Sequence, residues 1–107
     1  MIAISQEIQD ALISNWHRSR QDKNFDPTPV LKLFLPWAPA TWLVAEMNPR
    51  DRDSLFGLAI FSEEAELGDF SLAEIAALEG PADLRVEIDQ HWRAQKTLNQ
   101  YLAEHSA

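Results

Sequence analysis

Three apolar runs lie within residues 30–61, separated by two short breaks. They read VLKLFLPW, ATWLVAEM and SLFGLAIF. Side chains alternate in each run, as is typical of strands, whose successive residues point to opposite faces. Pro36 ends the first run because proline has no N–H to give a neighbouring strand, and Asn48-Pro49 is a turn signal after the second. The sequence therefore predicts a three-stranded antiparallel meander that supplies most of the core.

The same alternation assigns the meander residues to faces. In the second run, one predicted face carries Leu43, Ala45 and Met47, and the other carries Trp42, Val44 and Glu46. Gly57 interrupts the third run without a side chain to pack. We expect it to mark either a β-bulge or a point where another backbone approaches closely.

Three helices are predicted around the meander, at residues 4–19, 72–79 and 98–105. The first has apolar residues at helical spacing and Ser5 as its N-cap. The second opens with the capping box Ser71-Leu72-Ala73-Glu74 and is stopped by Gly80-Pro81. The third opens with another capping box, Thr97-Leu98-Asn99-Gln100.

Two further strands are expected, a short one at 66–70 and an alternating one at 85–92. In the last, Val86, Ile88 and Trp92 are predicted to form the buried side. The fold class is therefore α+β, with an antiparallel sheet of four to five strands and three short helices mainly on one face. At 107 residues, the chain is expected to be a single domain, 1–107.

Composition narrows the classes of function. Without cysteine there is no thiol nucleophile or thiolate metal site, and we expect no cofactor. No apolar run approaches the ~20 residues of a membrane span, and the N-terminus does not resemble a signal peptide. We expect a cytoplasmic protein that does not bind membranes. The net charge of −8 also opposes direct binding to nucleic acid.

The charge is unevenly distributed. Residues 63–89 hold nine acidic residues and one basic residue, and the rest of the chain holds eight of each sign, so this segment carries the whole imbalance. A surface of one sign attracts and steers a partner of the opposite sign. We therefore expect a basic protein partner. The predicted contacts are Glu63, Glu64, Glu66, Asp69, Glu74 and Glu79.

From about Pro29 onward, the chain resembles a family of small bacterial proteins, domain-of-unknown-function family 2958. The resemblance rests, in order, on VLKLFLPWAPATWLVAEMNPRDRD, FGLA, ELGDFSLAEIAALEGP and VEIDQHWRAQKTLNQY. The chain departs from the family pattern at Trp92, where Phe is usual, and between Ile60 and Glu66, which is acidic instead of Gly-rich. The resemblance implies a bacterial source and a plasmid or phage-like context, but no activity and no catalytic residues.

Two hypotheses of function remain open. The first is a non-enzymatic interaction module that uses the acidic 63–89 face; in one variant, that face mimics a phosphate backbone and occupies a DNA-binding protein. The second is a metal-dependent hydrolytic enzyme with Glu87, Asp89 and His91 as ligands on one strand face. A solvated strand face is the simpler explanation of these three residues, because oxygen and nitrogen side chains without a motif spacing often occur together by chance. The first hypothesis is favoured because the charge is strongly segregated and because the sequence offers no nucleophile–base pair. The oligomeric state is left open.

Overall fold

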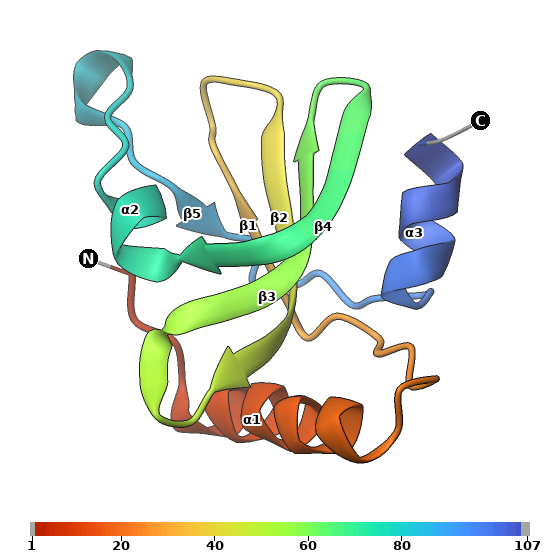
Figure 1. The fold of residues 1–107 in the computed structure, drawn as a ribbon. Coiled ribbons are helices and arrows are strands. Elements are labelled where there is room, and N and C mark those ends of the chain that lie inside the picture. Colours follow the sequence, from red (N-terminus) through yellow and green to blue (C-terminus); the bar gives the residue numbers. More distant parts are fainter. Residues whose placement is uncertain (1, 106–107) are drawn as a thin grey trace.

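A computed structural model describes residues 2–105 as an antiparallel five-stranded sheet with three α-helices (Figure 1). The strand order is β4-β3-β2-β1-β5. The elements are α1 Gln6–Gln21, β1 Leu31–Phe34, β2 Ala40–Asn48, β3 Asp51–Phe61, β4 Glu64–Ser71, α2 Leu72–Ala76, the 3-10 helix η1 Pro81–Asp83, β5 Glu87–Ile88 and α3 Leu98–His105. The α+β class and the meander at its centre are confirmed.

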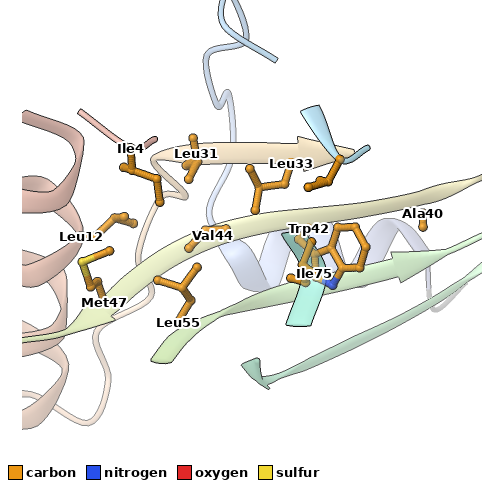
Figure 2. Packing of buried hydrophobic residues seen from close by; sticks show 11 residues of the cluster. Ile4, Leu12, Leu31, Leu33, Ala40, Trp42, Val44, Met47, Leu55 and Ile75 are labelled. Atoms are coloured by element: carbon orange, nitrogen blue, oxygen red, sulfur yellow. The ribbon is translucent and has the colours of Figure 1, made fainter. Parts of the chain in front are cut away.

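The sheet separates two clusters of apolar side chains. The first cluster packs α1 and α2 against one face and includes Leu12, Leu33, Trp42, Leu55 and Ile75 (Figure 2). The second cluster packs α3 against the opposite face and includes Leu43, Ala45, Leu58 and Leu98. Two of the three helices therefore share a face, as the sequence predicts, and α3 covers the other.

A β-bulge in β2 corrects the predicted faces of that strand. Val44 pairs with Gly57 and Glu46 pairs with Phe56, so Ala45 is an extra residue. Past the bulge, Met47 joins the first cluster, and Glu46 lies beside Phe56 of the second cluster. The predicted grouping of Glu46 with Trp42 and Val44 is therefore wrong, because one inserted residue reverses the alternation.

Gly57 lies opposite this bulge, where the backbone of β2 comes very close. A Cβ atom built on Gly57 would overlap the carbonyl oxygen of Leu43, at 2.0 Å. The sequence-based expectation of a bulge or a close backbone approach is confirmed, and both occur at the same place.

The predicted N-caps are present, but the capping box at Ser71 is only half formed. Ser71 Oγ accepts from the Glu74 N–H, and no return hydrogen bond from the Ser71 N–H to the Glu74 side chain occurs within residues 2–105. The Ser5 hydroxyl accepts a hydrogen bond from the Ile8 N–H at 3.2 Å, which begins α1 two residues later than predicted. Thr97 and Gln100 exchange both hydrogen bonds of a capping box. Within residues 2–105, no helix combines the length and the apolar character needed to cross a membrane.

Helix α2 and strand β5 are shorter than predicted. The helix ends at Ala76 because the chain then bends to place Gly80 against the Trp37 ring, where no Cβ atom would fit. Strand β5 keeps only two residues of the predicted 85–92. Val86 belongs to the first cluster and Trp92 packs against the second, so the chain must turn between them. The Trp92 N–H donates to the Asp89 carbonyl in that turn.

Candidate functional site

The β3–β4 hairpin carries four of the predicted partner-binding residues. Its two-residue turn, Ser62-Glu63, leads into β4, which is an edge strand of the sheet. The side chains of Glu63, Glu64, Glu66 and Asp69 are exposed, and none of them makes an ion pair or a hydrogen bond within residues 2–105. We call these four side chains the acidic edge.

The register divides the acidic edge between the two faces of the sheet. Glu66 pairs with Ala59 of the first cluster, whereas Asp69 pairs with Phe56, which packs on the second cluster. Glu64 and Glu66 therefore project on one face, and Asp69 projects on the face that α3 covers. The negative charge consequently borders the open edge of the sheet on both sides.

The rest of the acidic segment lies elsewhere. Glu74 is exposed on α2, and Glu79 follows that helix and pairs with Arg85 at 2.8 Å. Strand β5, with Glu87, lies at the opposite edge of the sheet from β4. The expected continuous surface over residues 63–89 is therefore not assembled, and the negative charge concentrates on the acidic edge.

The three candidate metal ligands are not brought together. Asp89 pairs with Lys32 at 3.6 Å, Glu87 is exposed on β5, and His91 is exposed in the following turn. Within residues 2–105, no group of three His, Asp or Glu side chains is placed to hold a metal ion. The predicted shared strand face is lost because β5 ends at Ile88.

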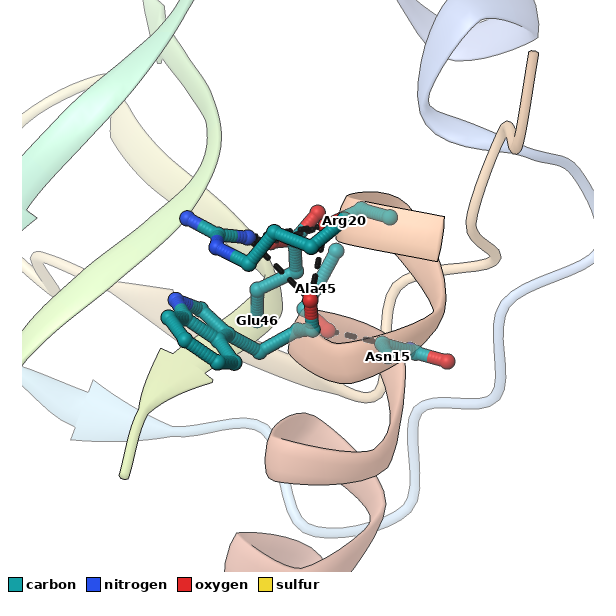
Figure 3. Close-up of polar contacts among 6 residues, drawn as sticks. Asn15, Arg20, Ala45 and Glu46 are labelled. Atoms are coloured by element: carbon teal, nitrogen blue, oxygen red, sulfur yellow. Dashed lines mark hydrogen bonds and ion pairs between the residues drawn. The ribbon is translucent and has the colours of Figure 1, made fainter. Parts of the chain in front are cut away.

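A buried carboxylate is the feature that sequence reasoning missed. Glu46 is only 5% exposed, and its Oε1 atom accepts hydrogen bonds from Ser19 Oγ at 3.0 Å and Arg20 Nη1 at 3.2 Å. The bulge places Glu46 on the opposite face of β2 from Trp42 and Val44. Asn15 Nδ2 also donates a hydrogen bond to the carbonyl of the bulged Ala45 (Figure 3). A single acidic residue inside the apolar run ATWLVAEM was the available signal.

Arg20 is held in place from several directions. Its guanidinium lies 3.8 Å from the Trp16 ring centroid, and its Nη1 donates to the Trp16 carbonyl, Ser19 Oγ and Glu46 Oε1. Cation–π contacts and charge-assisted hydrogen bonds both favour this position. Arg20 therefore balances the buried charge of Glu46 from the last turn of α1, and Figure 3 shows the two side chains next to each other.

A cavity opens beside this network. Its volume is about 610 Å³, within the range of roughly 300–1,000 Å³ that is typical of ligand sites. We call it the Glu46 pocket. It is lined by Trp16, Ser19, Arg20, Asp22, Lys23, Phe25, Asp26, Pro27, Glu46, Asn48, Ser54, Leu55, Phe56, Leu67, Asp69, Leu98 and Asn99. Asp69 thus belongs to both the acidic edge and this pocket.

Asp53 makes the other notable carboxylate contacts. Its carboxylate accepts hydrogen bonds from Ser71 Oγ at 2.5 Å and from the Ala73 N–H at 2.7 Å, which ties β3 to the start of α2. The Ser71 hydroxyl, followed by the Ala73 N–H, holds the pKa of Asp53 below its ordinary value of 3.8. We therefore assign the Asp53 carboxylate a structural role, which is to hold the start of α2 against β3.

The fold and these sites define a small α+β protein with an acidic sheet edge and a neighbouring pocket that contains a buried carboxylate. The chain belongs to the family described as "Protein of unknown function (DUF2958)", whose model matches residues 3–107. Comparisons with curated proteins and with solved structures gave no significant match. The family is the one that the sequence resembles, and its description adds no activity.

Proposed function

We propose that this chain is a cytoplasmic, non-enzymatic interaction module that binds a basic protein through the acidic edge. The observation that carries the proposal is the gathering of four unpaired carboxylates, three on the edge strand β4 and one in the turn that leads into it. Like charges in a row repel one another, so their grouping has an electrostatic cost that a basic partner would relieve. The bacterial mobile-element setting belongs to the proposal through the family resemblance alone.

The distribution of ion pairs supports binding over simple solubility. Of the nine acidic residues in 63–89, only Glu79 and Asp89 have a basic partner among the described residues. Solubility requires only a net charge away from zero, which evenly scattered charges also provide. Concentrated, unpaired charge at one edge instead favours a directed encounter with a partner of the opposite sign.

The backbone of β4 offers a second means of recognition. Phe61 and Glu64 close a two-residue hairpin, and such closing pairs exchange hydrogen bonds. Every second residue of β4 then directs its N–H and C=O groups away from β3, namely Ala65, Leu67 and Asp69. No backbone hydrogen bond of these outward groups occurs within residues 2–105. An extended partner segment can pair with such an edge.

The test compares proteins captured from the source cell by three immobilised forms of the chain. These are the natural sequence, the triple variant Glu63→Lys, Glu64→Lys and Glu66→Lys, and the control Glu7→Lys, Asp83→Lys and Glu87→Lys. Both variants change the net charge equally, at exposed residues. We expect a basic protein that the natural chain and the control retain and that the acidic-edge variant loses. Equal capture by all three forms would refute the proposal.

A further inference from the structure

We infer that the Glu46 pocket accepts a basic side chain, an arginine or a lysine, from the protein partner. This inference rests on the proposed function and names one specific contact between the chain and its partner. It starts from the carboxylate of Glu46, a residue that lines the pocket. Glu46 Oε1 takes both hydrogen bonds of the carboxylate, and Oε2 has no partner within residues 2–105. Within residues 2–105 no completely buried side-chain oxygen lacks a partner, so Oε2 keeps some contact with solvent.

The charges that line the pocket favour a cation. Four carboxylates, Asp22, Asp26, Glu46 and Asp69, face only two basic side chains, Arg20 and Lys23. Arg20 is already engaged with Glu46 Oε1. The carboxylate of Asp69 and the second oxygen of Glu46 remain without partners. A bound anion would meet this excess of negative charge, whereas an ammonium or guanidinium group would compensate it.

The apolar walls suit the rest of such a side chain. Phe56, Leu67 and Leu98 line the same cavity and belong to the second cluster or pack on it. Arginine and lysine place a charged head on an apolar stem of three or four methylene groups, which can lie along such walls. A small metal cation would leave these walls unused, so we assign the pocket to an organic cation.

The position of the pocket connects it to the acidic edge. Asp69 lines the pocket, and Glu64 lies five residues earlier on the same strand. At about 3.4 Å per residue, these two positions are about 17 Å apart. An extended partner segment of about six residues covers that distance. Such a segment would pair with β4, place basic residues near Glu64 and Glu66, and insert one basic side chain into the Glu46 pocket.

The experiment uses Nα-acetyl-arginine amide as the probe, followed by ¹⁵N NMR. We expect saturable shifts of the Trp16 indole N–H and of the Asn48 and Asn99 backbone amides, with a Kd of about 1 mM, as befits a ligand of this size. Nα-acetyl-citrulline amide is the matched control, because it has almost the same shape and no charge. Absence of shifts, or equal shifts with citrulline, would overturn the inference.

Two variants test the carboxylates. Asp69→Asn alters an exposed side chain without partners, so its fold should persist, and we expect it to weaken arginine binding several-fold. Glu46→Gln should weaken binding about tenfold, the effect of one charge-assisted hydrogen bond. Glu74→Gln, on α2 and outside the pocket lining, should leave binding unchanged. Equal binding by all three variants would contradict the assignment.

This test is separate from that of the proposed function. The probe experiment needs no partner, so failure of arginine to bind refutes the pocket and leaves capture by the acidic edge standing. If capture instead proves insensitive to reversal of Glu63, Glu64 and Glu66, the proposed function fails, whatever the pocket binds. When a partner is in hand, excess acetyl-arginine amide should weaken its binding, and the citrulline analogue should not.

Discussion

Trp42 is the residue whose loss should weaken the core most clearly. Its ring is 5% exposed in the first cluster and makes an edge-to-face contact with Phe61, with centroids 5.7 Å apart. We expect Trp42→Ala to lower the free energy of unfolding by about 3–5 kcal/mol, since it removes a large buried ring. Phe61→Ala should cost only about 1 kcal/mol, because Phe61 is half-exposed. Urea denaturation of both variants measures the difference, and equal losses would contradict this packing.

Asp53 should give the fold part of its sensitivity to acid. Because its pKa in the folded state is lowered, its contribution to stability is complete above its ordinary value of 3.8 and disappears as the pH falls through the folded pKa. Asp53→Asn should therefore lower the melting temperature near neutral pH and reduce its further decline below about pH 4. Ser71→Ala removes the leading hydrogen bond and should act in the same direction. Melting curves that decline identically with pH in all three proteins would contradict this role.

At the residue scale, helix N-caps are easier to predict from the sequence than the residues of a candidate site. Ser5, Ser71 and Thr97 were recognisable because capping chemistry is local and depends on residues three positions apart. The role of Glu46 could not be predicted in the same way. Its hydrogen-bond donors, Ser19 and Arg20, lie 27 and 26 residues earlier in the chain, and only the fold brings them together.

At the scale of elements, the β2 bulge and Gly57 act as one device. The bulge brings the β2 backbone so close that Gly57 has no room for a Cβ atom. Gly57→Ala should therefore destabilise the protein by about 1–3 kcal/mol, the usual cost of overpacking. Gly68 is the matched control, since it pairs directly with Gly57 on β4 and has open space around its Cα. Gly68→Ala should be neutral or slightly stabilising, and equal effects of the two changes in urea denaturation would contradict this account.

The local sequence pattern predicts the type of each element, but it does not predict the lengths of α2 and β5. Apolar alternation predicted β1, β2 and β3, whose central residues pair with each other. The alternation at 85–92 was equally regular, yet β5 spans two residues because Val86 and Trp92 serve opposite faces of the sheet. Such a choice between faces depends on α3 and the sheet together, and periodicity does not encode it.

For the whole molecule, topology decides how the acidic residues are distributed. The excess charge lies within residues 63–89 of the sequence, but the sequence does not show that the two strands of this segment, β4 and β5, are far apart. In the fold they are opposite edges, with β3, β2 and β1 between them. The acidic edge is therefore a smaller surface than the one expected from the sequence. It lies along β4, which is the longer of the two described edge strands, since β5 has only two residues.

The central claim, that the acidic edge binds a basic protein, is tested most directly by the rate at which a captured partner associates. We expect this rate to fall steeply as salt rises from about 50 to about 500 mM, because the screening length shortens from about 14 to about 4 Å. At low salt, reversal of Glu63, Glu64 and Glu66 should slow association by about tenfold or more. The control reversal of Glu7, Asp83 and Glu87 should have a much smaller effect, and the melting temperature of the acidic-edge variant should stay close to that of the natural chain. An association rate that responds neither to salt nor to the acidic-edge reversal would contradict the claim.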